Sequence, residues 1–556
     1  METDYQRVEF PYVRSRDQDA RVPVHRPVVV VGAGPVGLTA AIDLAQQGVP
    51  VVVLDDDNKL SYGSRAICFA KRTLEIWDRL GCGERMVQKG VSWNVGKVYF
   101  RDELVYSFNL LPEPGYRRPA FINLQQYYCE GFLYEHAQAL RNLEVRWKSK
   151  VVGVDVRSDG VVLSVETPDG AYRLTVDYVI ACDGARSPVR SLIGQESKGR
   201  AFRDRFLIAD VKMQAGFPPE RWFWFDPPFH PNQSVLLHRQ PDNVWRIDFQ
   251  LSANADPEEE KKPERVIPRI KALLGQDAQF EIEWVSVYTF SCSRMEKFRH
   301  GRVVFAGDAA HCVSPFGARG ANSGVQDAEN LAWKLKLVLG GKAPDALLDT
   351  YDEERGYAAD ENIQCSTRAT DFITPKNKVS RTFRDATLKL SKDYGFARRL
   401  VNSGRLSLPT TLRDSPLNTP DRDSFIGDMA PGAPSADAPI TVCSRAGWLL
   451  EQIGVDFTGV YFSDGTLTAH ARDALTRVSQ ASANPIKMVV VVPDGISLPD
   501  VSATVVEDVE GFVQRRFDAR PGTFYLMRPD QHVCARWRQF DVEATRSALA
   551  RATCNG

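Results

Sequence analysis

The clearest hydrophobic pattern in the chain is a run of four valines that ends in a glycine-rich turn. Val28–Val31 are followed by Gly32-Ala33-Gly34-Pro35-Val36-Gly37, and apolar residues then recur at helical spacing as far as Gly48. A second apolar run, Val51–Leu54, ends in Asp55. Continuous apolar runs suit strands buried on both faces, so the pattern predicts a strand, a helix and a parallel strand.

The glycine spacing of this βαβ unit predicts dinucleotide binding. Gly32 allows the tight turn, Gly34 allows a pyrophosphate to approach the backbone, and Gly37 allows the helix to pack on the sheet, while Pro35 opens the helix. Asp55 lies 18 residues after Gly37, where a carboxylate accepts the ribose hydroxyls of an adenosine. The alternative is an ordinary tight turn between a strand and a helix.

The pattern changes along the rest of the chain. Around residues 90–120 and 200–290, short alternating stretches rich in Trp, Phe and Val predict a largely antiparallel sheet. Residues 322–339 and 347–355 are helical in period, and a polar, proline-punctuated stretch at about 375–440 is typical of a linker with some helix. Apolar runs at 488–492, 523–527 and 533–537 predict a small separate α/β domain.

Composition excludes several classes of protein. Hydrophobic residues make up 43% and charged residues 25%, as in folded globular proteins, and 70 basic residues face 71 acidic ones, which favours neither nucleic acid nor an anionic membrane as partner. The ten cysteines form no C-x-x-C pair and no zinc spacing with the eight histidines, so we expect reduced thiols and no metal site. With no secretory pattern or membrane-spanning run, we expect a cytoplasmic protein whose residues 1–26 form a flexible, solvated arm.

Two more apolar stretches each end in an Asp beside a Gly. One is Tyr178–Ala181 followed by Cys182-Asp183-Gly184, and the other is Val303–Ala306 followed by Gly307-Asp308. Because only one G-x-G-x-x-G is present, a second dinucleotide would lack a Rossmann domain of its own. This favours a tightly held flavin over a freely exchanging nicotinamide.

With these three motifs in order, the chain resembles the single-component FAD-dependent aromatic hydroxylases. It is most similar to their phenolic branch, which includes 3-(3-hydroxyphenyl)propionate hydroxylase and the phenol, chlorophenol and nitrocatechol monooxygenases. Further matches extend over nearly the whole chain: Ser64-Arg65-Ala66, Phe121 to Glu130, Val287-Tyr288-Thr289, Leu347 to Arg355 and Arg528-Pro529-Asp530.

The resemblance implies an α/β fold with a Rossmann-like FAD-binding domain, an antiparallel-sheet substrate domain and a C-terminal thioredoxin-like domain. The implied boundaries are an arm at 1–26; FAD-binding segments at 27–90, 121–195 and 291–375; substrate-domain segments at 91–120 and 196–290; a linker at 376–435; and the thioredoxin-like domain at 436–556. The absence of C-x-x-C from the last of these implies that it carries out no redox chemistry.

The resemblance also implies which residues hold FAD. Asp308 matches the acid that binds the ribityl chain, and Gly307 lets the backbone approach it. The remaining matches are Arg65, Gln126 and Asp183, together with the loop and helix start at Pro315, Gly320 and Asn322, where backbone N–H groups stabilise negative charge on the reduced flavin. Arg65 and Gln126 could instead be ordinary surface or cap residues, and Asp183 a turn stabiliser.

The implied reaction is hydroxylation of an electron-rich ring through a flavin C4a-hydroperoxide, with NADH or NADPH as transient electron donor and O2 as co-substrate. We take Pro315, Arg319 and Tyr288 as candidate catalytic residues. Arg319 stands where many relatives carry Gln, and a cation there would favour acidic or nitro-bearing aromatics. The Asp that some relatives use as a base is absent, because Ile67 and Cys68 follow Ala66. His311 receives no catalytic role.

The antiparallel sheet also supplies candidates for the substrate site. Trp222, Trp224, His238 and Tyr288 are candidate substrate contacts, although core packing, or for His238 a hydrogen-bonded strand histidine, is the more common role of such residues. The alternatives are a polyketide-tailoring hydroxylase, a lipid or isoprenoid flavin oxidoreductase, and a regulatory flavoprotein. We expect a homodimer only because the resembled family commonly forms one.

Overall fold

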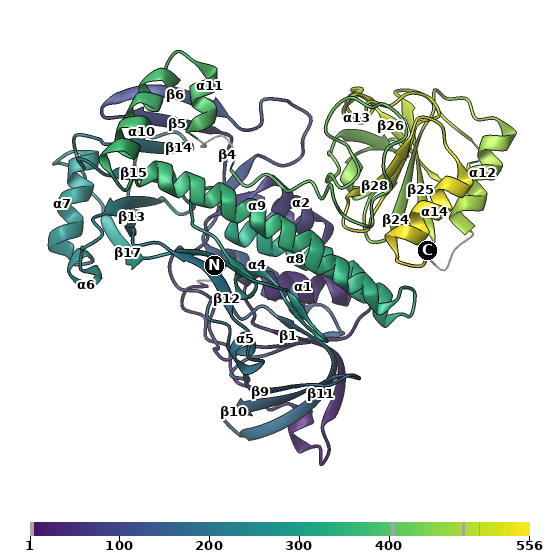
Figure 1. The fold of residues 1–556 in the computed structure, drawn as a ribbon, viewed down its shortest axis with the longest axis horizontal. Helices are drawn as coiled ribbons and strands as arrows, with labels where there is room; N and C mark the ends of the chain where they lie inside the picture. The colour runs from purple at the N-terminus through teal and green to yellow at the C-terminus, as the bar shows by residue number, and fades with distance from the viewer. Residues whose placement is uncertain (1–4, 402–405, 481–483, 500) are drawn as a thin grey trace.

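The computed structural model describes residues 5–401, 406–480, 484–499 and 501–556. The chain forms three large sheets, and two long helices, α8 (Gly320–Leu339) and α9 (Asp349–Ile373), cross the middle of the molecule (Figure 1). The C-terminal unit lies to one side of these helices and packs against α8 through Trp333 and Leu337. No helix in the described part of the chain combines the length and the apolar character that crossing a membrane would require.

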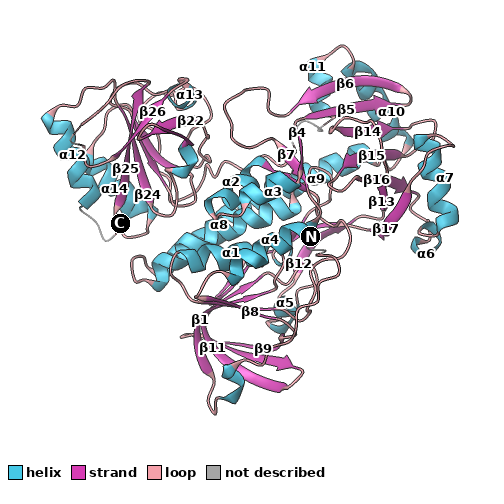
Figure 2. Cartoon of the chain, turned by 180° about the vertical axis from the view of Figure 1, so that it is seen from behind, coloured by secondary structure: helices cyan, strands magenta, loops and turns pink. Residues whose placement is uncertain are grey.

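The first sheet contains the predicted βαβ unit, with β1 (Val24–Val31), α1 (Pro35–Gln46) and β2 (Val51–Leu54). The strand order is β19-β20-β11-β1-β2-β8, and every neighbouring pair from β20 to β8 is parallel. The other bounds are β8 (Leu143–Arg146), β9 (Lys150–Val156), β10 (Val161–Thr167), β11 (Gly170–Ala181), β19 (Arg299–His300) and β20 (Val303–Phe305). Helix α1 packs against α8 and α4 (Gln126–Gln138), which buries β1 (Figure 2).

The second sheet is largely antiparallel, as predicted for the stretches at 90–120 and 200–290. Its order is β17-β13-β16-β15-β14-β5-β6, and only the β14–β5 pair is parallel. The bounds are β5 (Val95–Phe100), β6 (Glu103–Asn109), β13 (Arg205–Lys212), β14 (Arg221–Phe225), β15 (Ser234–Arg239), β16 (Val244–Leu251) and β17 (Glu281–Tyr288).

The two faces of the second sheet pack against different helices. One face buries residues such as Leu207 and Ile247 against α7 (Pro263–Leu274), next to the short α6 (Pro257–Glu260). The opposite face packs Phe206 and Phe223 with residues of α9 and α10 (Lys378–Ser391), and α11 (Gly395–Leu400) follows. The helices α10 and α11 supply the helical part of the predicted linker.

The C-terminal unit is thioredoxin-like. Strands β24 (Phe457–Phe462) and β25 (Ile486–Pro493) are parallel and joined through α12 (Ala469–Gln480), and β27 (Phe524–Met527) and β28 (Val533–Trp537) continue the sheet antiparallel before α14 (Val542–Ala552). On the far side of β25 lie β26 (Thr504–Asp508), β22 (Pro439–Val442) and β23 (Arg445–Trp448), with α13 (Phe512–Arg516) nearby.

Buried charges join the C-terminal unit to the central helices. Arg528 donates to Glu354 of α9 at 2.5 and 3.0 Å and to Asp530 at 2.5 Å, while Lys334 of α8 donates to the same Glu354 at 2.7 Å. All four side chains are fully buried. The Arg528-Pro529-Asp530 segment, which the resemblance singled out, therefore holds the C-terminal unit against α8 and α9.

Smaller elements connect the sheets. They are β3 (Cys68–Ala70), β7 (Phe121–Asn123) and β4 (Val91–Trp93) in one three-stranded sheet, β12 (Ser197–Ala201), β18 (Ser291–Met295) and β21 (His311–Cys312) in another, and the helices α2 (Lys71–Arg79), α3 (Gly83–Lys89) and α5 (Pro188–Leu192).

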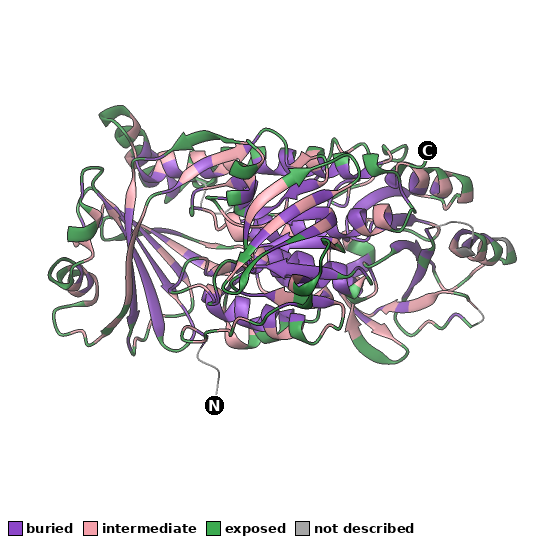
Figure 3. Ribbon diagram, turned by 90° about the horizontal axis from the view of Figure 1, so that it is seen from below, coloured by how far each residue is buried: buried purple, intermediate pink, exposed green. Residues whose placement is uncertain are grey.

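The N-terminal segment differs from the solvated arm that the sequence predicts. Within residues 5–26, Tyr5 is buried against Tyr128 and Phe132, and Asp17 is buried in ion pairs with Arg26 and Arg146. These contacts attach the segment to the first domain. Figure 3 shows that the buried, purple parts of the chain form the interior of the molecule and that the exposed, green parts lie at its periphery. The prediction missed this because both the aromatic partners and Arg146 lie more than 100 residues away.

Candidate functional site

The parallel register of the first sheet brings the three motifs to one edge. Val31 of β1 is paired with Leu54 of β2 and Ala181 of β11, and Ala181 is paired with Phe305 of β20. The residues that follow these strand ends therefore lie close together. Ligands bind in open parallel sheets at the carboxyl ends of the strands, so the edge marked by Val31 is the candidate site.

A cavity of about 580 Å3 opens at this edge. Six of the residues predicted to bind a cofactor line it: Gly32, Gly34, Asp55, Arg65, Gln126 and Asp183. Gln126 accepts from the backbone N–H of Ala66 at 3.0 Å and donates to Glu130 at 2.8 Å, and Glu130 accepts from Ser61 N–H at 2.6 Å. Through these hydrogen bonds, Gln126 and Glu130 fix residues 61–66, the part of the cavity wall that includes Arg65.

The glycines of the first turn each meet a different steric demand. Gly32 has a φ of 105°, and a Cβ there would lie 2.5 Å from the carbonyl oxygen of Cys182. A Cβ on Gly37 would lie 2.0 Å from the carbonyl oxygen of Gly32. Gly34 has no atom within 4 Å of its Cβ position, although it caps the helix that Pro35 opens. The space beside Gly34 is therefore an open cradle at a helix N-terminus, which suits a diphosphate.

Two carboxylates face this cavity with acceptor oxygens. Asp55 accepts from Ala33 N–H at 2.6 Å and Asp57 N–H at 2.9 Å, and burial raises the pKa of Asp55 to about 6. Asp183 accepts from Val189 N–H at 2.9 Å through one oxygen, while its other oxygen is buried with no partner in the described part of the chain. Unsatisfied buried acceptors are rare, so the second oxygen indicates a bound hydroxyl donor.

The third motif presents Asp308 toward the same region. Gly307 has a φ of 62°, and the Asp308 side chain is exposed and accepts no hydrogen bond from any residue that the structure describes. The Cβ position of Gly320, at the start of α8, lies 3.9 Å from an Asp308 oxygen. The turn therefore offers a free carboxylate beside a helix N-terminus.

A buried triad that the sequence did not reveal supports this turn. Asp327 accepts from Gly307 N–H at 3.0 Å and Arg355 at 2.6 Å, and its carboxylate lies 2.6 Å from Nε2 of His311. Burial opposes ionisation, but His311 and Arg355 outweigh it and lower the pKa of Asp327 to about 2. His311 is thus a structural partner of Asp327.

The loop that leads into α8 contains an exposed proline and a strained alanine, and it is followed by a fully hydrogen-bonded asparagine in the first turn of the helix. Pro315 is exposed, and Ala318 adopts a φ of 52°, a strained conformation of the kind that collects at functional sites. The side chain of Asn322 is fully used: it accepts from Ala70 N–H and the Thr73 hydroxyl and donates to the carbonyls of Cys68 and Ala318.

Arg319 lies at the same helix start but turns toward α9. It is 6% exposed and donates to Asn362 at 2.8 Å. The cation that the sequence placed at the pocket is therefore engaged with a neighbouring helix. Its catalytic role stays a prediction.

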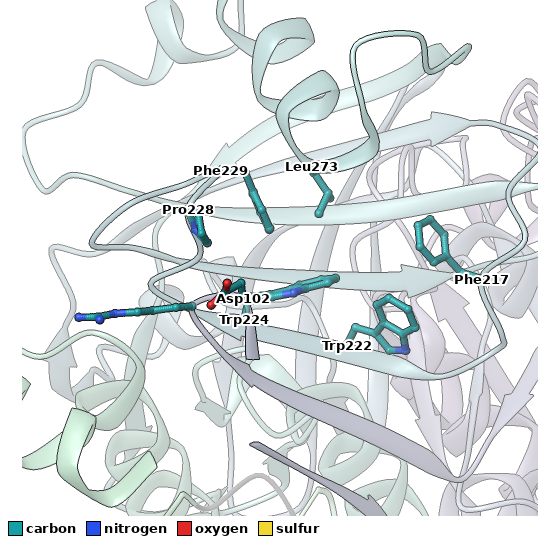
Figure 4. Close-up of a pocket in the computed structure, with 8 residues that line it drawn as sticks. Asp102, Phe217, Trp222, Trp224, Pro228, Phe229 and Leu273 are labelled. Carbon is teal, nitrogen blue, oxygen red and sulfur yellow. The ribbon is translucent and has the colours of Figure 1, made fainter. Parts of the chain in front are cut away.

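The four candidate substrate residues fall on opposite faces of the second sheet. His238 and Tyr288 lie on the face toward α9, whereas Trp222 and Trp224 lie on the α7 face. The two tryptophans line a separate pocket of about 370 Å3 with Phe217, Phe229 and Leu273 (Figure 4). The structure does not bring Trp222 and Trp224 together with His238, because alternate residues of a strand point to opposite faces.

A buried polar cluster surrounds His238 on the α9 face. Arg246 donates to Asp248 at 2.9 and 3.2 Å and to the Ser64 carbonyl at 2.6 Å, and Nε2 of His238 lies 3.9 Å from Asp248. Nδ1 of His238 is 4.0 Å from Sγ of Cys68. Sequence reasoning missed Arg246 and Asp248, although charges alternating with Trp245, Ile247 and Phe249 are a visible signal for a two-faced strand.

Comparison with known proteins gives a family. A family described as "FAD binding domain" matches residues 25–366. A 3-(3-hydroxy-phenyl)propionate/3-hydroxycinnamic acid hydroxylase from Mycolicibacterium smegmatis is 26% identical, over 91% of this chain and 89% of its own. A flavin-dependent monooxygenase from Mycobacteroides abscessus is 33% identical, over 61% of this chain and 73% of its own, and a "Probable NADH-specific resorcinol 4-hydroxylase" from Rhodococcus jostii is 34% identical over 59% and 62%.

Solved structures share the fold. The flavin-dependent monooxygenase PieE, solved with FAD and substrate, superposes with a TM-score of 0.79 at 21% identity and covers 96% of this chain and 100% of its own. The p-nitrophenol 4-monooxygenase PnpA from Pseudomonas putida superposes with a TM-score of 0.61 at 28% identity, over 69% of this chain and 99% of its own. The open cradle at Gly34 and the free acceptors of Asp183 and Asp308 fit the diphosphate and hydroxyls of FAD.

Proposed function

The chain belongs to the FAD-binding-domain family of flavin-dependent monooxygenases, and from that premise we propose that it hydroxylates a single-ring phenol. One aromatic C–H, NAD(P)H, a proton and O2 give the ring hydroxyl, NAD(P)+ and water. The observation that carries the proposal is a series of contacts that leads from the start of α8, beside the candidate cofactor site, to the α9 face of the second sheet. Asn322 at the start of α8 donates to the carbonyl of Cys68 at 2.9 Å, and Sγ of Cys68, which donates to Asn123 at 3.2 Å, lies 4.0 Å from Nδ1 of His238 on the second sheet.

The cofactor residues of this proposal come from the three motifs. The diphosphate lies against Gly32, Gly34 and Pro35, with Gly37 packing the helix behind them, and Asp55 accepts from the adenosine ribose. The flavin half contacts Arg65, Gln126, Asp183, Gly307, Asp308, Pro315, Gly320 and Asn322. When bound and reduced, FAD supplies the chemistry that activates O2 for transfer of one oxygen atom.

The α9 face of the second sheet supplies the substrate side. Burial and the neighbouring guanidinium groups hold the pKa of His238 well below its usual value, so its imidazole is neutral and can accept a hydrogen bond from the phenol. Burial raises the pKa of Tyr288, so that hydroxyl remains a donor rather than a base. Sharing the phenol proton with His238 raises the electron density of the ring, which directs oxygen to the positions ortho or para to the hydroxyl.

The surroundings of this face exclude water. Phe206, Phe223, Phe290 and Phe316 are all buried in one cluster with Ile373 of α9. A dry site strengthens the electrostatic effect of the N–H groups at the start of α8 on any negative charge nearby. The exclusion of water also prevents activated oxygen from reacting with solvent before it reaches the ring.

The relatives support a single aromatic ring, because those named for hydroxyphenylpropionate, resorcinol and nitrophenol all act on one-ring phenols. The resorcinol hydroxylase is named NADH-specific, which favours NADH as donor here. A homodimer and a cytoplasmic location remain predictions.

The test is consumption of NADH and NADPH in air by the FAD-loaded protein. The panel contains resorcinol, 3-(3-hydroxyphenyl)propionate, 4-nitrophenol and one polycyclic phenol, with product mass and hydrogen peroxide measured together. We expect at least one monocyclic phenol to accelerate consumption and to gain one oxygen atom. If every monocyclic phenol yields only hydrogen peroxide while the polycyclic phenol is hydroxylated, the proposed substrate class is wrong.

A further inference from the structure

Arg221 is a buried cation that forms no hydrogen bond and no ion pair in the described part of the chain. It is the first residue of β14, it is 9% exposed, and its Nε is fully buried with no hydrogen bond. Residues 5–401, 406–480, 484–499 and 501–556 form no hydrogen bond or ion pair with its guanidinium. Buried charges are normally paired, so this group is an exception that calls for a ligand.

Arg221 points to the face of the sheet that carries the polar cluster. Its side chain lies on the same side as Phe223 and Phe225, opposite to Trp222. Trp222 is paired with Leu237, so the next position places Arg221 beside His238. Arg221 therefore lies next to His238 on the α9 face of the second sheet, where the proposed function places the substrate.

Among the described residues, the other ionisable groups on this face attract or repel Arg221 but form no hydrogen bond or ion pair with it. Asp248 is already paired with Arg246 at 2.9 Å, and His238 is uncharged because burial and the two guanidinium groups depress its pKa. Asp210 is three strands away in the sheet order and accepts from Gln240 at 3.2 Å. Asp210 lies directly across from Arg246 on the neighbouring strand, so both carboxylates of this face are placed beside Arg246 and neither forms an ion pair with Arg221.

The hydroxyls and thiols near Arg221 supply no counter-charge either. Burial raises the pKa of the Cys68 thiol to about 11, and it also raises the pKa of Tyr288. Both groups stay protonated near neutral pH. Burial lowers the pKa of Arg221 itself, as expected for a cation without a counter-ion.

We infer that Arg221 binds a carboxylate of the aromatic substrate, so that the preferred substrates are phenols that carry a carboxyl group. This inference rests on the proposed function. A guanidinium presents two parallel N–H groups that match a carboxylate. A carboxylate is ionised throughout the neutral range, whereas a phenol titrates near pH 10, so the carboxylate is the matching permanent anion. The phenol hydroxyl then remains available to His238.

The test compares binding of an acid with binding of its uncharged amide. The ligands are 3-(3-hydroxyphenyl)propionate and 3-(3-hydroxyphenyl)propionamide, titrated by calorimetry into the FAD-loaded protein, its Arg221→Gln variant and its Arg239→Gln variant. Arg239 is a matched control because it lies on the adjacent strand and its guanidinium lies over Trp245 on the opposite face.

We expect the wild type to bind the acid about 10- to 100-fold more tightly than the amide, the range that hydrogen bonds to a charged group supply. Arg221→Gln should lose that preference, Arg221→Lys should recover part of it, and Arg239→Gln should keep it. Equal binding of acid and amide by the wild type, or an unchanged preference in Arg221→Gln, would overturn the inference.

Two further readouts separate the possible failures. Because Arg221 forms no hydrogen bond or ion pair with any residue that the structure describes, Arg221→Gln should unfold at the same temperature as the wild type or higher when no ligand is present, and a clear loss of stability would indicate a structural role instead. If a variant does not fold, the wild-type comparison of acid and amide decides the matter. Hydroxylation of resorcinol without any preference for acids would retain the proposed function and refute only the role of Arg221.

Discussion

Substituting alanine at two glycines of the first turn should separate cofactor binding from folding. Gly34→Ala places a methyl group in a cradle that has no protein atom within 4 Å, and Gly34 has a φ of -74°, which any residue can adopt. Gly37→Ala places a methyl group 2.0 Å from the carbonyl oxygen of Gly32, which is backbone and cannot turn aside. The same chemical change therefore meets open space in one case and a backbone carbonyl in the other.

The expected magnitudes follow from these contacts. Without FAD, Gly34→Ala should change the free energy of unfolding by less than about 0.5 kcal/mol, as for substitutions that meet nothing. Its methyl group fills space that the diphosphate needs, and overpacking costs about 1–3 kcal/mol, so FAD should bind about 5- to 150-fold more weakly. Gly37→Ala should lose about 1–3 kcal/mol of stability even without FAD.

The assay uses protein from which FAD has been removed. Thermal unfolding of that protein reports stability, and quenching of flavin fluorescence on adding FAD reports affinity. If Gly34→Ala binds FAD as the wild type does, the diphosphate does not lie in this cradle and the proposed orientation of the cofactor is wrong. If it unfolds as early as Gly37→Ala, the reading of Gly34 as open space is wrong.

Three further predictions concern charged groups. Asp308→Asn should weaken FAD binding by about tenfold while leaving the stability of the FAD-free protein unchanged, since the Asp308 carboxylate has no partner in the described chain. FAD affinity should fall as the pH drops below about 6, approaching tenfold per unit, because the buried Asp55 becomes protonated and ceases to accept from the ribose; Asp55→Asn should remove this slope. Arg528→Met should cost about 3–5 kcal/mol in urea unfolding, because it leaves Glu354 buried without that partner, whereas Arg546→Gln on an exposed ion pair should cost less than about 1 kcal/mol.

Each of these predictions has a clear contrary outcome. Full FAD affinity in Asp308→Asn would remove Asp308 from the cofactor site, and a stability loss in the FAD-free variant would make it structural. A pH-independent FAD affinity between pH 5 and 8 would contradict the raised pKa of Asp55. Unchanged urea unfolding of Arg528→Met would show that the buried charges do not hold the two domains together.

The place of the candidate cofactor site in the fold could be predicted from the sequence because its signals are local. The valine run before Gly32 and the apolar stretches before Asp183 and Asp308 each mark a buried strand end, and parallel strands place such ends at one edge of the sheet. Steric demands at Gly32 and Gly37 are likewise met within one turn. The antiparallel second sheet was also visible, since alternation with a period of two is a property of short segments.

Two features could not be predicted from the sequence. One is which face of the second sheet lies against α9, and the other is which distant residues pair with each other. Alternation along β14 shows that Arg221 and Trp222 point opposite ways, but only the packing of α9 on one side and α7 on the other decides which of them faces the site. The partners of Asp327 and Arg528 are equally invisible in sequence, because Glu354 meets Arg528 across 174 positions. The sequence by itself determined the strand ends and turns of the candidate dinucleotide site, because these depend on neighbouring residues. The tertiary structure alone decided which buried charges are paired, as Arg528 is with Glu354, and which form no ion pair among the described residues, as with Arg221, because burial and pairing depend on residues brought together by the fold.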